Sequence, residues 1–163
     1  GILNTFLREV FGLEAQPWLS DPTLAKISTI VVAVWATTGW HAVIYLAFLQ
    51  SISKDYFEAA AIDGASKWQQ IRYITIPLLA PAMTVSILLL LTNGLKVYEI
   101  PFALTGGGPG FETHTITQVI VLRGISEAQF GLASAISVVF FLITLIIGYF
   151  QFSMMRRREE RML

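Results

Sequence analysis

Cysteine is missing from the 163-residue sequence, and charged residues are scarce. The absence of cysteine excludes disulfide bonds, thiolate metal sites and cysteine nucleophiles. Charged residues make up 13% of the chain, against about 25% in ordinary soluble domains, while hydrophobic residues make up 55%. Lysine plus arginine and aspartate plus glutamate each number 11, so no net basic field is available to attract nucleic acid. These deficits argue against a soluble fold and against nucleic-acid binding.

The charges that are present are largely excluded from three apolar runs. The predicted spans are residues 27–49, 77–99 and 130–155, with approximate bounds. As helices, their uncharged parts are long enough to cross a hydrocarbon layer of about 30 Å. A buried helix of a large soluble protein can also be apolar all round, but three such runs in one short chain favour a membrane protein. We therefore expect a single all-α integral membrane domain over residues 1–163, with three spans.

No signal peptide is recognisable near the beginning of the chain. The first residue is Gly1, and the segment after it has neither a basic region nor a cleavage-site pattern. Three helices can hardly enclose a polar route through a membrane, because the route needs polar groups shielded from lipid on all sides. We expect this chain to be part of a longer protein with further helices.

Lysine and arginine are unevenly distributed around the spans, and basic flanks are retained in the cytoplasm. Residues 50–76 and the C-terminal tail are therefore predicted to be cytoplasmic, and residues 100–129 extracytoplasmic. The tail is expected to be a topology signal that contacts lipid headgroups. The short apolar run 116–122 cannot span, so it is expected to lie at the membrane interface or to pack against the other helices. The basic residues behind this orientation are Lys54, Lys67, Arg72, Arg156, Arg157, Arg158 and Arg161.

The predicted cytoplasmic loop has a helical pattern with a break. Ser53 is a candidate N-cap, because its hydroxyl can accept a bond from a free amide of the first turn. Gly64 can adopt the left-handed conformation that ends one short helix before another begins. Asp63 and Lys67 have the i and i+4 spacing at which an ion pair supports a helix. Pro77 marks the entry to the second span.

A motif of fixed spacing runs through the same loop. It consists, in chain order, of Glu58, Ala59, Ala60, Gly64, Ile74, Ile76 and Pro77. This pattern resembles the EAA motif of ABC importer permeases, which has leucine where this sequence has Ile76. The segments WLSDP at 18–22, LTGGGPGFET at 104–113 and FGLASAIS at 130–137 are similar to the sugar-permease branch of that family. The resemblance covers essentially the whole chain and implies the last three helices of a six-helix type I importer domain.

The resemblance implies that this loop couples transport to ATP hydrolysis. In the family, the EAA loop forms a helix that docks on a cytoplasmic ATPase subunit, where the glutamate meets a basic residue. The alternative for Glu58 is a solvated acid in a helix, and the alternative for the small residues is a simple preference for helix or turn. The expected coupling residues are Glu58, Ala59, Ala60, Asp63, Gly64 and Pro77.

The resemblance also implies an assembly. The chain shows no ATP-binding motif, so ATP and magnesium are expected in two cytoplasmic ATPase subunits, while this chain is expected to carry no cofactor and no enzymatic activity. The other expected partners are a second permease subunit, an extracytoplasmic sugar-binding protein and membrane lipid. The implied location is the inner membrane of a bacterium or an archaeon.

Four polar residues near the outer end of the second span are candidates for contact with the cargo. Resembling permeases place substrate contacts on this helix, and polar residues inside a membrane often face a cavity. The alternative is that Lys96 and Glu99 pair with each other at the membrane interface. The candidates are Asn93, Lys96, Tyr98 and Glu99.

A glycine-rich run follows the second span. No strand precedes it and no Gly-Lys-Ser/Thr follows it, so it does not fit a phosphate-binding loop. It is expected to form a tight extracytoplasmic turn near the docking surface of the binding protein, through Gly106, Gly107, Gly108 and Pro109. His41 and His114 have no histidine or carboxylate partner at helical spacing, so packing or hydrogen bonding is expected of them and no metal site is.

Other functions also fit apolar spans. A secondary transporter driven by an ion gradient would need acidic or broken-helix ion sites, and no acid lies inside the three uncharged runs. A membrane enzyme would need titratable residues that converge on one site. Within the permease interpretation, the cargo could be a sugar phosphate or another polar solute instead of a sugar.

Overall fold

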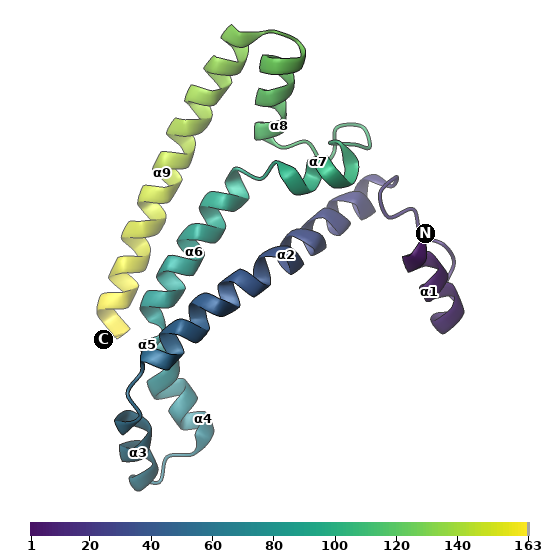
Figure 1. Cartoon of the computed structure of the whole chain (residues 1–163). Helices are drawn as coiled ribbons and strands as arrows, with labels where there is room; N and C mark the ends of the chain where they lie inside the picture. The colour runs from purple at the N-terminus through teal and green to yellow at the C-terminus, as the bar shows by residue number, and fades with distance from the viewer. Residues whose placement is uncertain (163) are drawn as a thin grey trace.

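The structure is a computed structural model that describes the backbone of residues 1–162 and the side chains of residues 1–156. Within this part of the chain, every regular element is a helix (Figure 1). The two longest are α2 (Pro22–Ser51) and α9 (Phe130–Met162), and α6 (Ala80–Leu95) lies between them. The shorter elements are α1 (Ile2–Phe11), α3 (Asp55–Ile62), α4 (Lys67–Gln70), α5 (Ile76–Leu78), α7 (Glu99–Thr105), α8 (Ile116–Val121) and the π-helical turns η1 (Ile71–Thr75) and η2 (Leu122–Ser126).

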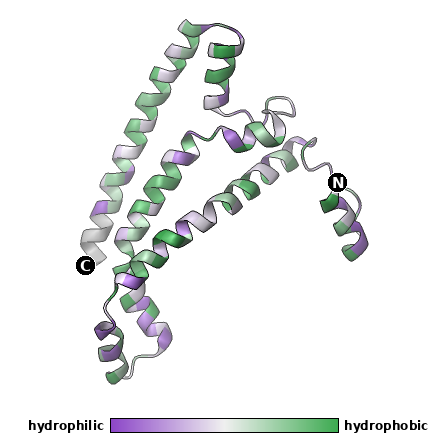
Figure 2. Ribbon diagram, in the orientation of Figure 1, coloured by the Kyte–Doolittle hydropathy of each residue, from purple (hydrophilic) through white to green (hydrophobic). Residues whose placement is uncertain are grey.

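Up to three apolar spans are present in the described part of the chain. By length and composition, α2 and the Phe130–Arg156 part of α9 can each cross a membrane. A third span results when α6 is joined to the helical stretch before it, Lys67–Leu78. Apolar residues cover much of α2, α6 and α9 (Figure 2). The predicted all-α membrane fold is confirmed.

α2 begins before the apolar run predicted from the sequence. Asp21 is its N-cap, and Asp21 Oδ1 accepts hydrogen bonds from the backbone N–H of Thr23 at 3.0 Å and of Leu24 at 2.8 Å. Pro22 occupies the first turn, where a missing N–H leaves no helical bond unmade. The cap and the proline start the helix, whereas hydropathy marks only residues 27–49.

The second apolar stretch is bent, so the predicted range 77–99 is not one straight helix. The stretch Lys67–Leu78 and α6 differ in direction by 60°. Pro77 and Pro81 are four residues apart, and proline has no N–H, so the helical bond from residue 81 to the carbonyl of residue 77 cannot form. α6 then ends at Leu95, and Glu99 lies in the separate helix α7. Hydropathy does not detect this break, because the residues around it are apolar.

The long helices meet through small residues. α6 contacts both α2 and α9, α7 contacts α2, and α8 folds back along α9 (Figure 1). Alanine at a contact lets helix backbones approach closely, while the large apolar side chains stay on the outside of this chain. The apolar run 116–122 packs against α9, and its predicted position at the membrane interface stays a prediction. The buried apolar side chains among those described are Ala25, Leu79, Ala80, Ala82, Pro101 and Ala133.

The C-terminal tail continues α9 as backbone helix through Met162. The side chains of Arg157, Arg158 and Arg161 lie outside the described residues. The predicted contact of this tail with lipid headgroups stays a prediction.

Candidate functional site

The EAA segment, residues 50–76, forms a hairpin of short helices beyond the ends of α2 and α6 (Figure 1). α3 and α4 are joined by a turn at Gly64, whose φ of 78° lies in the left-handed region. The N–H of Ala65 donates to the carbonyl of Ala60 at 2.9 Å, and the N–H of Gly64 donates to the carbonyl of Ala61 at 3.1 Å. These two bonds form a Schellman motif, which satisfies the last carbonyls of a helix. The glycine of the sequence motif therefore ends α3.

α4 begins with a capping box that the sequence interpretation missed. Ser66 Oγ accepts a bond from the N–H of Gln69 at 3.3 Å, and Gln69 Oε1 accepts one from the N–H of Ser66 at 2.7 Å. The spacing Ser-x-x-Gln is the signal that would have identified it. Together with the turn at Gly64, this box sets the direction of α4 relative to α3 through local bonds.

One local prediction for this hairpin is confirmed and one is wrong. α3 begins at Asp55, and Ser53 Oγ accepts a hydrogen bond from the N–H of Asp55 at 3.3 Å, as predicted for a cap, while the same hydroxyl donates to the Asp55 carboxylate at 3.0 Å. Asp63 and Lys67 do not form a helical pair, because the glycine turn puts them in different helical segments. Among the described side chains, no ion pair joins these two residues.

Most of the predicted coupling residues lie on the exposed part of the hairpin: Glu58, Ala59, Asp63 and Gly64. A Cβ atom on the glycine would meet no atom within 4 Å. Ala60 is half-buried, and Pro77 lies half-buried in α5 beside the bend. Large apolar side chains that the motif does not predict are exposed as well, with Ile62 at 87%, and the others are Tyr56, Trp68, Ile71 and Tyr73.

The four candidate cargo contacts do not converge on one site. Lys96 lines a cavity of about 170 Å³ between α6 and α9. Tyr98 lines a different cavity of about 150 Å³, formed with residues of α7 and α8. Asn93 and Glu99 are exposed and line neither cavity. Lys96 and Glu99 form no ion pair within the described side chains, so the pairing alternative is not realised.

The cavity beside Tyr98 combines aromatic and polar groups. Tyr98 stacks on Phe102 with ring centroids 5.2 Å apart. His114, Gln118 and Ser126 line the same cavity. The sequence interpretation did not connect these residues with Tyr98, because they lie beyond the glycine-rich run and only the fold of α8 brings them close.

The glycine loop, residues 106–113, is a turn organised by one buried threonine. Thr113, which is 7% exposed, donates from Oγ1 to the carbonyl of Gly108 at 2.7 Å. The same oxygen shares a hydrogen bond with Thr105 Oγ1 at 2.6 Å. Gly106 and Gly107 have φ values of 60° and 94°, which side chains other than glycine rarely adopt. The sequence predicted a tight turn but not the threonine that holds it.

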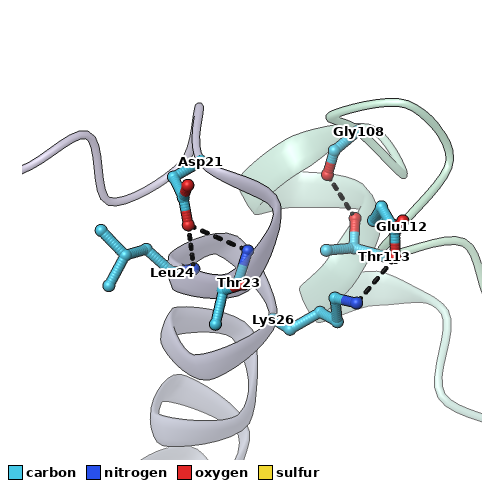
Figure 3. A network of polar contacts seen from close by, with 7 residues as sticks. All are labelled: Asp21, Thr23, Leu24, Lys26, Gly108, Glu112 and Thr113. Atoms are coloured by element: carbon cyan, nitrogen blue, oxygen red, sulfur yellow. Dashed lines mark hydrogen bonds and ion pairs between the residues drawn. The ribbon is translucent and has the colours of Figure 1, made fainter.

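The glycine loop is connected to the first turns of α2. Lys26 Nζ and Glu112 Oε2 are 2.7 Å apart, and both side chains are roughly half exposed. Figure 3 shows this ion pair near the polar cap of α2 and the threonine bond of the loop. The Gly108–Pro109 peptide bond is cis, and Phe111 is an exposed aromatic residue on the same loop.

A buried polar pair joins α2 to α6. His41 Nδ1 and Ser86 Oγ are 2.7 Å apart, and the two residues are 9% and 1% exposed. The predicted hydrogen-bonding role of His41 is confirmed. The sequence interpretation did not identify Ser86 as its partner, because the two are 45 residues apart. His114, by contrast, packs its ring edge-on against Phe111 at 4.9 Å.

Apolar spans joined by an exposed helical hairpin define a multi-pass membrane domain of the transporter class. The chain belongs to the family described as binding-protein-dependent transport system inner membrane component, whose model matches residues 2–161. The resemblance to ABC importer permeases that was inferred from the EAA motif is thereby confirmed.

Several relatives are named for sugar transport. Trehalose/maltose transport system permease protein MalF of Thermococcus litoralis is 37% identical over 145 residues, which are 89% of this chain and 48% of that protein. Sulfoquinovosyl glycerol transport system permease protein SmoG of Agrobacterium fabrum is 31% identical over 159 residues, which are 98% of this chain and 51% of that protein.

Solved structures of an alginate importer have the same fold. In the crystal structure of a bacterial alginate ABC transporter in complex with alginate pentasaccharide-bound periplasmic protein, one chain matches with a TM-score of 0.87 and 30% identity. The match covers 98% of this chain and 55% of that chain. This chain thus spans about half the length of the relatives that it matches.

Proposed function

We propose that the protein containing this chain is a membrane subunit of an ABC importer and forms part of the pathway for a sugar or an oligosaccharide. The observation that carries the proposal is the EAA segment, which presents the motif on an exposed helical hairpin. The choice of a sugar as cargo is supported by relatives named for trehalose, maltose and sulfoquinovosyl glycerol, and by the alginate importer with the same fold.

The hairpin has the features of a surface that docks on a cytoplasmic ATPase subunit. Its exposed apolar residues, such as Ile62, offer area to bury, and Glu58 offers a charge that a basic residue can pair. Ala59 and Gly64 are small enough for the partner to approach closely. Movement of the docked hairpin would pass along α4, η1 and α5, through Pro77, into α6 as a rigid-body shift.

The proposed orientation follows from the basic residues, which favour a cytoplasmic hairpin and C-terminus and an external glycine loop. In this orientation the glycine loop is available to an extracytoplasmic sugar-binding protein, with Gly106–Pro109 shaping the turn and Phe111 offering apolar contact. The second permease subunit and the missing helices would complete the pathway within the lipid of a bacterial or archaeal inner membrane. ATP and magnesium would bind to two ATPase subunits, and this chain would need no cofactor.

The proposed pathway follows the outer half of α6 and the residues after it. Tyr98 is the best placed sugar contact, because its ring and that of Phe102 form a stacked aromatic surface next to polar side chains. Asn93 and Glu99 are exposed in this chain and are available to the pathway only if the other helices face them.

A second candidate cargo is an anionic sugar, such as a uronic acid or a sugar phosphate. Lys96 lines the cavity between α6 and α9 and has no carboxylate partner among the described side chains. A cation held next to a cavity favours an anion over a neutral sugar. Lys96→Gln should therefore weaken transport of an anionic cargo about tenfold and leave a neutral cargo nearly unaffected.

The test is ATP hydrolysis by the complete transporter in lipid, together with its binding protein, across neutral oligosaccharides, uronic-acid oligomers and sugar phosphates. One class of sugar should stimulate hydrolysis. Glu58→Ala should reduce this stimulation about tenfold or more, because a charge pair at a docked interface is lost. Glu9→Ala, at an exposed acid on α1, is the matched control and should have no effect.

Substitutions at Gly64 separate bulk from backbone strain. Gly64→Ala and Gly64→Trp share the cost of a φ of 78°, but only the indole adds volume to the proposed interface. Stimulation should be lost in the tryptophan variant and only lowered in the alanine variant. Normal stimulation in both Glu58→Ala and Gly64→Trp would contradict the coupling role. Uptake that is driven by an ion gradient without ATP would contradict the importer class.

A further inference from the structure

The hairpin is connected to α2 at its first end and to α6 at its last. Three residues separate the end of α2 at Ser51 from α3, whereas α4 is connected to α6 through η1, α5 and the bend. A displacement of the hairpin can therefore move α6 as a whole, or it can be absorbed by a change in the bend angle. Only the first of these responses would transmit movement into the membrane.

The bend is the weak point of this connection. Hydrogen bonds close the helix on both sides of it, from the N–H of Leu79 to the carbonyl of Thr75 and from the N–H of Met83 to the carbonyl of Leu79, both at 3.0 Å. Pro81 has no N–H to donate between them, and kinks at proline are places where helices open and close. The backbone by itself does not hold the 60° angle at one value.

The bond between His41 and Ser86 bridges this weak point from the side. Ser86 lies six residues into α6, which places it about 9 Å beyond the bend along the helix. His41 lies ten residues before the end of α2, about 15 Å from the hairpin. The chain from His41 to Ser86 runs through the end of α2, the hairpin, the bend and the start of α6. The hydrogen bond between the two residues closes this segment into a loop that contains the bend.

The surroundings of the bond keep it closed. Ala82 and Ser86 are four residues apart in α6, so they lie on one face of that helix, and both are buried. Because Ser86 bonds His41, this is the face of α6 that meets α2. Alanine contacts alone allow two helices to slide, whereas a hydrogen bond is directional. Opening it would leave two buried polar groups without partners in an apolar setting.

We propose that the His41–Ser86 hydrogen bond is a positioning contact that holds the bend angle, so that displacement of the hairpin moves α6 and α2 together. The inference rests on the proposed function for the origin of that displacement, but the stiffness of the bend is a separate physical property. His41 and Ser86 act through the backbone that they hold in place, without contact to ATP.

The stiffness is measured by spin-label distances in the complete transporter in lipid. This chain has no cysteine, so Lys67→Cys, an exposed position on α4, and Leu90→Cys on α6 provide one label on each side of the bend. The pair should show one narrow distance distribution, and His41→Phe or Ser86→Ala should broaden it about twofold. The double variant should broaden it no further than either single variant, because one bond is lost in all three. Labels at Leu90→Cys and Leu142→Cys, on α6 and α9, are the control and should not change.

The functional readout is the amount of sugar moved per ATP hydrolysed. His41→Phe and Ser86→Ala should lower it about threefold or more, while hydrolysis without sugar stays unchanged. His41→Asn keeps a donor and an acceptor, so it should restore both the narrow distribution and the yield of transport. A purely structural role predicts lower assembly and lower basal hydrolysis instead.

The outcomes separate this inference from the proposed function. An unchanged distance distribution in both His41→Phe and Ser86→Ala overturns the inference. If Glu58→Ala uncouples transport but His41→Phe does not, the coupling role of the hairpin stands and the role of the bond falls. If His41→Phe broadens the distribution while Glu58→Ala and Gly64→Trp both leave stimulation normal, the stiffening is supported and the coupling role of the hairpin falls.

Discussion

The EAA hairpin and the glycine loop are both short connections between apolar stretches, yet they are held in different ways. The hairpin is shaped by bonds between near neighbours, such as those of the Gly64 turn and the Ser66 capping box, and its side chains are mostly exposed. The glycine loop has a buried threonine at its centre and an ion pair to α2 across 86 residues of sequence. A segment held by local bonds can move as a unit, whereas a loop bonded to a long helix is fixed to that helix.

The largest effect is expected where the glycine loop is most crowded. At Gly107, an added Cβ would overlap the ring of His114, and the φ of 94° adds backbone strain. Gly107→Ala should lower the free energy of unfolding by about 3 kcal/mol. Gly110 has a φ of 57° with open space around it, so Gly110→Ala should cost only about 1 kcal/mol. Thermal unfolding of the two purified variants compares them, and equal effects would show that the loop is not crowded.

The next effect concerns the buried threonine. Thr113→Val keeps the shape but removes the hydroxyl that bonds Gly108 and Thr105. The unfolding free energy should fall by about 2 kcal/mol, because the carbonyl of Gly108 loses its partner. Thr113→Ser keeps the hydroxyl and should recover most of the loss. Denaturant unfolding measures both, and an unaffected valine variant would mean that the loop is held elsewhere.

A smaller and strictly local effect is expected in the hairpin. Ser66→Ala removes the side-chain half of the capping box and should destabilise α4 by about 1 kcal/mol. Hydrogen exchange at the N–H of Gln69 should accelerate about fivefold, while exchange in the glycine loop stays unchanged. Ser134→Ala, at an exposed serine of α9, is the control. Faster exchange in both connections would contradict the local character of the hairpin.

The smallest effect belongs to the Lys26–Glu112 ion pair. Both side chains are roughly half exposed, so solvent screens the pair and Lys26→Met should cost at most about 1 kcal/mol. The cost should shrink further at high salt. A double-mutant cycle with Glu112→Gln isolates the interaction energy of the pair. An interaction energy that does not change with ionic strength would show that the contact is not electrostatic.

Sequence reasoning succeeded for features that depend on near neighbours. The apolar stretches could be located because the cost of placing a residue in lipid depends on that residue. Gly64 could be identified as the end of a helix because the left-handed conformation favours glycine. Ser53 could be identified as a cap because its hydroxyl needs only the nearby N–H of Asp55 as a donor.

Sequence reasoning failed where two helices had to meet. Lys96 and Tyr98 are two residues apart, yet they line different cavities, because both lie in the non-helical connection between the end of α6 at Leu95 and the start of α7 at Glu99. Ser86 could not be predicted as the hydrogen-bond partner of His41, because hydropathy does not say which faces of two helices touch.

By itself, the sequence determined that this chain is a helical membrane domain with an EAA hairpin, because hydropathy, glycine placement and motif spacing are local properties of the chain. Only the tertiary structure decided the 60° bend, the burial of Thr113 and the bond between His41 and Ser86. These features depend on which helix faces pack together, and contacts between residues distant in the chain select those faces.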